Sequence, residues 1–185
     1  MTNEWHLGDR LREVRLARQL SVRTLASRAG FSPSFISQVE LGQASPSIAS
    51  LERIAAALDV TLSSFFPDDE QAPSAVVRAG ARQELTSVWS QAQIEALGPV
   101  AAGRTLEPML ITLAPGGRSS KDPVPHAQEQ VSFVLDGRLT LIRGVMTHDW
   151  SAGDAVTLTA GTPHRWENTG VEPARLLIVT ARPAR

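Results

Sequence analysis

The sequence predicts a multi-domain α + β protein in which a helical bundle precedes an all-β barrel or sandwich. Three observations predict this fold class. Apolar residues follow a helical period up to about residue 66, a polar segment bounded by prolines covers residues 67–75, and short β-branched runs separated by Gly and Pro fill the remainder. A chain of 185 residues is long enough for two small domains. We therefore expect domains at residues 1–66 and 76–185, joined by a linker at residues 67–75.

The first domain is expected to consist of helices whose ends are marked by capping residues. Ser21 and Ser32 are suitable N-caps, and Pro33 suits the first position of a helix because its missing N–H costs nothing there. Gly30 tolerates the positive φ with which many helices end, and Pro67 stops the last turn. The expected segments are Leu7–Arg18, Ser21–Ala29, Ser32–Glu40, Ile48–Leu58 and a short turn at Thr61–Phe66.

The stretch Ser21–Gly42 is the most informative part of the chain. It reads as two short helices joined by a tight turn, and its apolar residues are spaced to pack both helices on one shared core. Ser34, Ser37 and Gln38 are left facing outward. Such short or amide side chains can hydrogen-bond to base edges when a helix enters the major groove of DNA.

Composition excludes several classes of protein. The chain is 42% hydrophobic and 20% charged, which is ordinary for a soluble protein, and it contains no cysteine for a disulfide or a thiolate metal site. No apolar run approaches the roughly 18 residues of a membrane span, and the acidic N-terminus is no signal peptide, so we expect a cytoplasmic protein without membrane contact.

The net charge is −1, but six of the seven arginines in residues 1–66 lie between positions 10 and 28. Such clustering can supply phosphate contacts.

The second domain shows the pattern of an all-β fold. Turn signals such as Asp136-Gly137 and Ala160-Gly161 alternate with short runs of strand-forming residues. The expected strands are Leu106–Leu113, Val131–Leu135, Leu139–Ile142, Ala155–Thr159 and Leu176–Thr180. Along the strand that starts at Gln130, alternation places Gln130, Ser132 and Val134 on one face.

The N-terminal domain resembles the five-helix DNA-binding domain of the Cro/phage-repressor type, the xenobiotic-response-element-like regulators. The resemblance is carried by Leu25-Ala26, Gly30, Ser32–Glu40, Gly42, Pro46-Ser47 and Leu51–Leu58. It implies that Ser32–Glu40 is the recognition helix, a candidate site that includes Ser32 and has Ser34, Ser37 and Gln38 toward the bases. It also implies phosphate contacts from Arg23, Ser45 and Ser47, with Arg28 as a further candidate. One such domain covers half a site, so a homodimer is expected on double-stranded DNA.

The C-terminal domain resembles a cupin, a small double-stranded β-helix barrel. The second half of the cupin pattern, G-x5-P-x-G-x2-H-x3-N, is matched in register from Gly153 to Asn168, with Thr159 in place of the proline. The first half, H-x-H-x3,4-E-x6-G, ends at Gly137 and departs from the family at two positions. Val124 stands at the position of the first histidine and Gln130 at that of the glutamate. His126 is therefore the one metal ligand of this half of the motif that is retained.

These departures remove half of the cupin metal ligands. His126 and His164 remain, but Val124 cannot bind a metal and the amide oxygen of Gln130 is a weak ligand for transition metals. A register in which His126 is the first histidine and Gln128 the second leaves no glutamate at the required distance. We therefore expect no metal cofactor. If a divalent ion were bound, its ligands would be His126 and His164.

The barrel is expected to hold a small effector rather than a metal. We expect Gln130, Ser132, His126, His164 and Trp166 to converge on an apolar pocket with polar anchors, joined by Arg118 and Met109. The alternative is a filled core in which both histidines are satisfied by hydrogen bonds.

The two resemblances together imply a dimeric transcriptional regulator, with the cupin as sensor and dimerisation module. Repression is the more frequent mode for this architecture, and the expected protein is not an enzyme. Two alternatives remain open at this point. In the first, the protein binds DNA constitutively and the cupin serves only as a dimer scaffold. In the second, the cupin is a metal-dependent enzyme fused to a DNA-binding domain.

Overall fold

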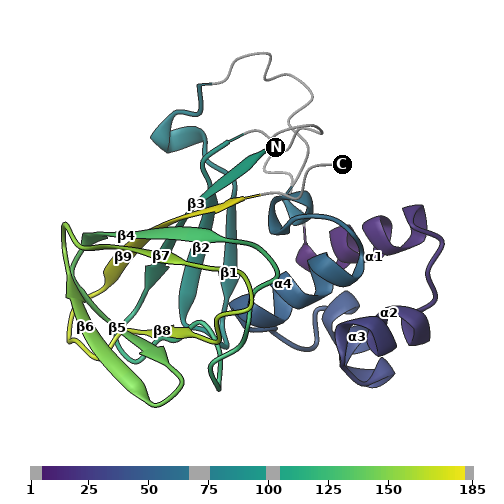
Figure 1. The fold of residues 1–185 in the computed structure, drawn as a ribbon. Coiled ribbons are helices and arrows are strands. Elements are labelled where there is room, and N and C mark those ends of the chain that lie inside the picture. Colours follow the sequence, from purple (N-terminus) through teal and green to yellow (C-terminus); the bar gives the residue numbers. More distant parts are fainter. Residues whose placement is uncertain (1–5, 67–75, 99–104, 182–185) are drawn as a thin grey trace.

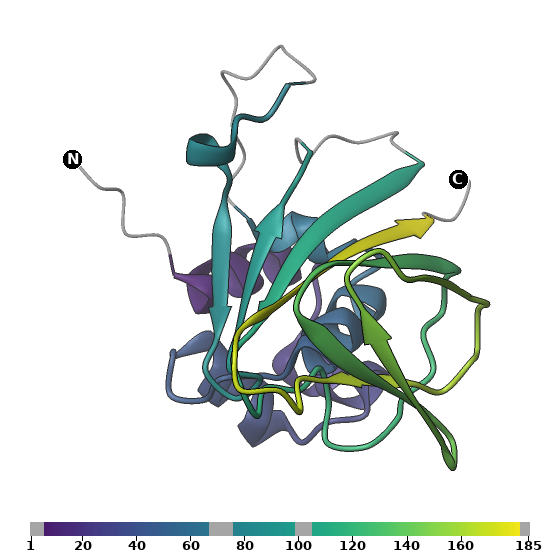
Figure 2. The same ribbon diagram turned by 90° about the vertical axis from the view of Figure 1, so that its left-hand side faces the viewer.

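A computed structural model describes residues 6–66, 76–98 and 105–181 of the protein. Figure 1 shows a helical domain (residues 6–66) beside a β-domain (residues 76–181), with helix α4 lying between the other helices and the strands. The view turned by 90° shows the strands of the β-domain in front of the helices (Figure 2). The linker expected at residues 67–75 lies outside the described residues.

The helices begin and end where local sequence signals place them. Their bounds are α1 (Leu7–Ala17), α2 (Val22–Ala29), α3 (Pro33–Glu40) and α4 (Ile48–Ala57). The hydroxyl oxygens of Ser21, Ser32 and Ser47 each accept a hydrogen bond from the backbone N–H three residues later, at 3.0–3.1 Å. Gly30 ends α2 with φ 68°, as the left-handed end of a helix requires. The core of the domain is formed by fully buried residues: Leu11, Leu25, Ile36, Leu51, Ile54, Phe65 and Phe66.

The five-helix bundle implied by the family resemblance is wrong in its helix count. The described part of the domain has four α-helices, and the fifth element is the 3₁₀ turn η1 (Leu62–Phe65). Phe66 already has extended backbone, with φ −83° and ψ 154°. A residue that precedes a proline is driven out of the helical region by the proline ring, and Pro67 follows Phe66, so this segment cannot continue into an α-helix. No helix among the described residues is long and apolar enough to cross a membrane.

The β-domain consists of two antiparallel sheets. The larger has the strand order β1-β2-β3-β9-β4-β7 and the smaller the order β6-β5-β8. Their bounds are β1 (Glu84–Ser87), β2 (Ala92–Ala96), β3 (Leu106–Leu113), β4 (Gln130–Asp136), β5 (Arg138–Arg143), β6 (Met146–Ser151), β7 (Ala155–Leu158), β8 (Arg165–Glu167) and β9 (Ala174–Ala181), after a short 3₁₀ turn η2 (Ala79–Ala81). The alternation predicted for β4 is confirmed, since Gln130, Ser132 and Val134 are all buried.

Helix α4 docks on the β-domain through its N-terminus. The first N–H groups of an α-helix have no partner within the helix. Here the N–H of Ile48 donates to Ser90 Oγ at 3.2 Å, and the N–H of Ala49 donates to the Ser119 carbonyl at 3.1 Å. Ser87 Oγ adds a hydrogen bond to the carbonyl of Pro46 at 2.7 Å. The two domains are therefore joined by hydrogen bonds that satisfy otherwise free backbone groups of α4.

Candidate functional site

Helix α3 presents a short polar surface. Ser34 and Gln38 are exposed and Ser37 is half-buried, whereas Ile36 and Val39 on the opposite side are buried in the core. Ser32 lies at the start of the helix with its hydroxyl oxygen bound to the N–H of Phe35 at 3.1 Å. The periodicity of α3 thus separates a packing face from a face that can hydrogen-bond to another molecule.

A buried ion pair fixes the end of α3 against α1. Arg15 Nε lies 2.6 Å from Glu40 Oε1 and Arg15 Nη2 lies 2.9 Å from Glu40 Oε2, and both side chains are 8% exposed. Arg15 Nη1 also donates to the Leu20 carbonyl at 2.8 Å. The hydrogen bond that Arg15 donates to the Glu40 carboxylate raises the pKa of Arg15, against the effect of burial. This two-pronged contact connects the C-terminal end of α3 to α1.

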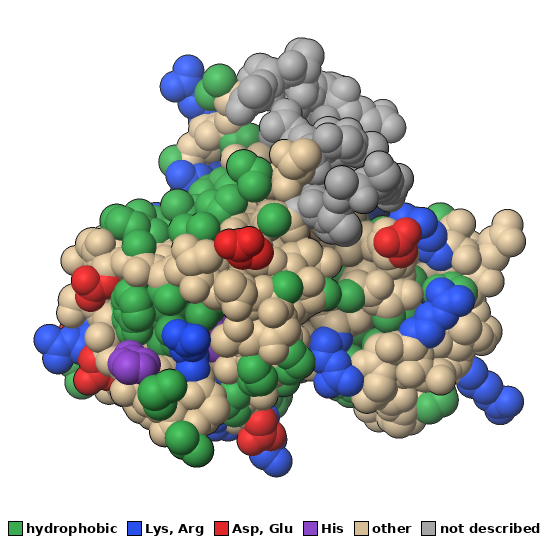
Figure 3. Space-filling view, viewed as in Figure 1, with side chains coloured by type: hydrophobic (Ala, Val, Ile, Leu, Met, Phe, Trp, Pro, Cys, Tyr) green, Lys and Arg blue, Asp and Glu red, His purple; other side chains and the backbone are tan. Residues whose placement is uncertain are grey.

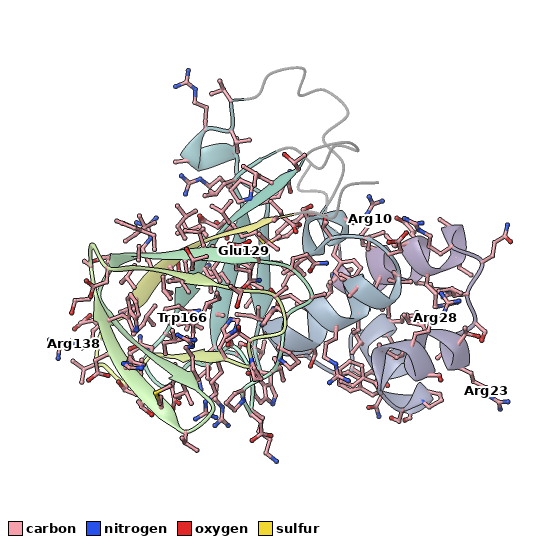
Figure 4. All side chains as sticks on the ribbon, in the orientation of Figure 1. Arg10, Arg23, Arg28, Glu129, Arg138 and Trp166 are labelled. Carbon is pink, nitrogen blue, oxygen red and sulfur yellow. The ribbon has the colours of Figure 1, made fainter. Side chains whose placement is uncertain are left out.

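The predicted phosphate contacts fall into two groups. Arg23 on α2 is exposed and extends away from the β-domain, and Arg28 on the same helix is also exposed (Figure 4). Ser45 and Ser47 instead lie beside the β-domain. Ser45 Oγ accepts the N–H of Trp89 at 3.3 Å, and the buried Ser47 hydroxyl caps α4. These two hydroxyls form hydrogen bonds within the protein. Arg23 lies on the exposed outer face of the helical domain, whereas Ser45 and Ser47 do not.

The space-filling view shows basic side chains on both domains. Blue side chains lie around the helical domain, at the right of Figure 3, and also at the edges of the β-domain, which carries green hydrophobic patches as well. The arginines between positions 10 and 28 all belong to the helical domain, because these residues lie in α1, α2 and the loop between them.

Two histidines of the β-domain are stacked on each other. The ring centroids of His126 and His164 are 4.5 Å apart with an interplanar angle of 29°. His164 Nδ1 donates to the Thr162 carbonyl at 2.9 Å. Gln130 Nε2 lies 3.5 Å from His126 Nδ1 and 3.3 Å from Thr180 Oγ1. The structure therefore brings His126, His164 and Gln130 together, as the sequence predicted.

The carboxylate beside His126 comes from the helical domain. Glu52 Oε2, on α4, lies 3.0 Å from His126 Nδ1, and the two side chains are 24% and 15% exposed. Burial lowers the pKa of His126, but the Glu52 carboxylate outweighs it, so that the pKa stands above the ordinary 6.5. Burial is also the main cause of the lowered pKa of His164, and the positive charge favoured on His126 adds to it. The site therefore favours one charged and one neutral imidazole.

The remaining predicted site residues lie elsewhere in the β-domain. Ser132 and Trp166 are buried, and within the described residues Ser132 Oγ and Trp166 Nε1 have no hydrogen-bond partner. Trp166 lies inside the β-domain (Figure 4) and packs edge-on against Trp150, with centroids 6.2 Å apart. The guanidinium of Arg118 lies over the ring of Trp89, 5.3 Å from its centroid. The expected convergence of seven residues is thus only partial.

A cavity of about 870 Å³ lies between the two domains. Its walls on the β-domain include Met109, His126 and Gln130, and its walls on the helical domain include Glu52 and Arg53. Ser132, His164, Trp166 and Arg118 are not among its lining residues. Sequence reasoning missed Glu52 and Arg53, because nothing in the polar face of an amphipathic helix signals which residues will meet a second domain.

The side chains do not fit the metal of a typical cupin. Val124 and Gln130 occupy two ligand positions with a hydrocarbon and an amide, and His164 Nδ1 is taken up by the Thr162 carbonyl and His126 Nδ1 by Glu52. In the described part of the chain, no group of three His, Cys, Asp or Glu residues is placed to hold a metal ion.

Comparisons with known proteins agree with this two-part architecture. Residues 6–63 match the family model of a helix-turn-helix domain, and residues 109–180 match that of a cupin domain. The HTH-type transcriptional regulator PuuR of Escherichia coli (strain K12) is 28% identical over 173 residues, which are 92% of this chain and 91% of PuuR.

Solved structures extend the comparison. The HTH_3 family transcriptional regulator from Vibrio cholerae has a TM-score of 0.74 and 27% identity, covering 96% of both chains. Hydroxypropylphosphonic acid epoxidase from S. wedmorenis has a TM-score of 0.50 and 20% identity, covering 94% of this chain and 96% of that one. At that identity, the likeness to the epoxidase concerns the fold alone.

Proposed function

The chain belongs to the helix-turn-helix transcriptional regulators that carry a cupin domain, and from this premise we propose how it binds DNA and responds to a ligand. As a DNA-binding regulator it must read a base sequence. We propose that α3 enters the major groove with Ser34, Ser37 and Gln38 toward the base edges, while Arg23 contacts phosphate. The exposed polar face of α3, held in place by the Arg15–Glu40 pair, is the observation that carries the proposal.

The chemistry of this face defines the kind of readout. The amide of Gln38 can form two hydrogen bonds with adenine. A serine hydroxyl can hydrogen-bond to any of several bases and therefore discriminates less between them. Such a surface gives modest specificity per domain. We propose that two copies pair through their β-domains and bind half-sites about one helical turn apart. The dimer then recognises both half-sites at once and is more specific than one DNA-binding domain alone.

The β-domain is proposed to bind a small effector without a metal and without catalysing a reaction. The cavity of about 870 Å³ supports this role, because ligand sites in proteins commonly fall in this size range. A pure dimer scaffold would have no use for such a space. We propose that the effector alters operator affinity by favouring one arrangement of the two domains, and that the protein is a repressor.

The test uses the full-length protein and an operator selected from a randomised duplex library. Fluorescence anisotropy then measures affinity for the selected site and for random DNA. Gln38→Ala is expected to lose about 1–3 kcal/mol on the selected site and little on random DNA, because a base contact is removed. Arg23→Ala is expected to weaken both DNAs alike and to lower the salt dependence by about one counterion. Equal losses for Gln38→Ala on both DNAs would reject base reading by this residue.

Sedimentation of the same samples tests the assembly. Two protein chains are expected per operator duplex. One chain per duplex, at protein concentrations that saturate the anisotropy signal, would contradict the proposed dimer.

A further inference from the structure

Glu52 joins the DNA-binding domain to the candidate effector site. It extends from α4 to His126, which is 74 residues away in the sequence, and forms an ion pair at 3.0 Å. Two further contacts between α4 and the β-domain lie at the N-terminus of the helix, one turn earlier, and involve backbone groups of Ile48 and Ala49. The Glu52–His126 pair is thus a side-chain contact between the domains that lies on the wall of the cavity.

The lining of the cavity describes the shape of a suitable ligand. The β-domain contributes apolar side chains, Met109, Ile111 and Ile178, which are all buried. Among the polar lining residues, Glu52 Oε2 and Gln130 Nε2 both lie within 3.5 Å of His126 Nδ1. Other polar side chains also line the cavity, among them Arg18, Arg28, Asp59 and Glu107. A ligand that fits this distribution has an apolar chain and one polar end.

The charge of that polar end follows from the donors that surround it. His126 Nδ1 and Gln130 Nε2 lie 3.5 Å apart, and both carry N–H groups when His126 is an imidazolium. The protein itself places a carboxylate against His126. An amine in this position would compete with His126 for the Glu52 carboxylate and, where His126 is protonated, would place two positive charges side by side.

We propose that the cavity binds a small aliphatic carboxylate, whose carboxylate group displaces Glu52 from His126 and is held by His126 and Gln130. This rests on the proposed effector role of the β-domain. The exchange leaves the charge balance of His126 unchanged, because one carboxylate replaces another. Glu52, already 24% exposed, turns to solvent.

The displacement has a direct route to the recognition helix. Arg53, the neighbour of Glu52 on α4, donates through Nη2 to the carbonyls of Ala29 and Gly30 at 2.7 and 3.3 Å, and its guanidinium lies 4.4 Å from the centroid of the Phe31 ring. Phe31 packs on Phe35 of α3 with centroids 4.9 Å apart. Movement of α4 would therefore act on the turn between α2 and α3. Loss of the Glu52 contact would leave α4 held on the β-domain by the hydrogen bonds at its N-terminus, and so less firmly than before. Operator affinity should fall when the carboxylate binds.

The experiment compares hexanoate with hexylamine, two probes with the same chain and opposite charge. Binding to the full-length protein is followed at pH 6 by calorimetry and by NMR of the histidine side chains. A probe of this size is expected to bind with a Kd on the order of 1 mM. Glu52→Gln should tighten hexanoate about threefold to fivefold, because the competing carboxylate is gone. His126→Gln should weaken hexanoate about tenfold or more.

Glu129→Gln is the matched control. It removes one carboxylate from an exposed position next to Gln130, on the β-domain in Figure 4, and should leave hexanoate binding unchanged. Circular dichroism of each variant establishes that it is folded. Because Glu52→Gln is expected to strengthen binding, a misfolded variant cannot imitate the result.

Each outcome decides the proposal. Hexylamine binding that is lost in Glu52→Gln would show a cationic ligand and overturn it, as would the absence of saturable binding by either probe. Anisotropy with the selected operator is measured in parallel. Failure to bind DNA without ligand refutes the proposed function, whereas DNA binding that hexanoate leaves unchanged refutes the coupling through Glu52.

Discussion

Removing the carboxylate of Glu40 tests how the recognition helix is held. Glu40→Ala removes the carboxylate partner of the Arg15 guanidinium and leaves its hydrogen bond to the Leu20 carbonyl, in a place where the Arg15 side chain is 8% exposed. Breaking a buried ion pair from one side typically costs about 3–5 kcal/mol, because the other charge stays buried without compensation. We expect a loss of this size in the free energy of unfolding of the helical domain.

The assay is urea denaturation followed by far-UV circular dichroism, where the helices dominate the signal. Glu13→Ala is the matched control on the same surface. Glu13 pairs with Arg10 at 3.2 Å but is 68% exposed, and such pairs contribute about 0–1 kcal/mol. If Glu40→Ala cost no more than Glu13→Ala, the argument that burial makes the Arg15 pair decisive would be wrong.

A double variant separates stability from DNA binding. Arg15→Met combined with Glu40→Leu removes both charges and should recover most of the lost stability, because an apolar pair of similar volume avoids the cost of burying charge. Operator affinity should stay below that of the wild type if the two-pronged contact is needed to orient α3.

Three further predictions concern other parts of the molecule. Gly8→Ala should destabilise the helical domain by about 1–3 kcal/mol in the same denaturation assay, because a Cβ there would lie 2.4 Å from the backbone oxygen of Glu40. Gly80→Ala, which meets nothing within 4 Å, should be near neutral. The raised pKa of His126 means that its pairing with Glu52 stabilises the protein fully below pH 6.5 and that this contribution is lost as the pH rises through the raised value. Thermal unfolding from pH 6 to 8 should show this loss in the wild type and a flatter profile in Glu52→Gln; identical profiles would contradict the pairing. Gln130→Glu should weaken hexanoate binding, since it places a second carboxylate where a ligand carboxylate would lie, and unchanged affinity would argue against that position.

The elements that the sequence predicted well are those governed by local interactions. The N-caps Ser21 and Ser32 act on N–H groups three residues away, and the left-handed Gly30 ends its own helix, so both effects can be read from a few neighbouring residues. Strand β3 was predicted with the observed bounds, because its apolar and β-branched run Met109–Leu113 ends just before a Pro-Gly turn signal at residues 115–117.

The elements that were missed lack such a local signal. Strand β6 has five exposed residues of six and therefore no alternation to detect; it forms because its backbone pairs with β5. The strands β1 and β2 are short and border residues that form a turn, and β8 has three residues.

The sequence alone determined the order of the two domains, the polar face of α3 and the loss of two metal-ligand positions at Val124 and Gln130. These are properties of residue type and spacing. The tertiary structure alone decided that Ser47 is buried in a cap, that Arg118 lies over Trp89, and that Glu52 meets His126. Contacts between residues far apart in the chain depend on how two independently patterned domains dock, and no periodicity within either domain encodes that arrangement.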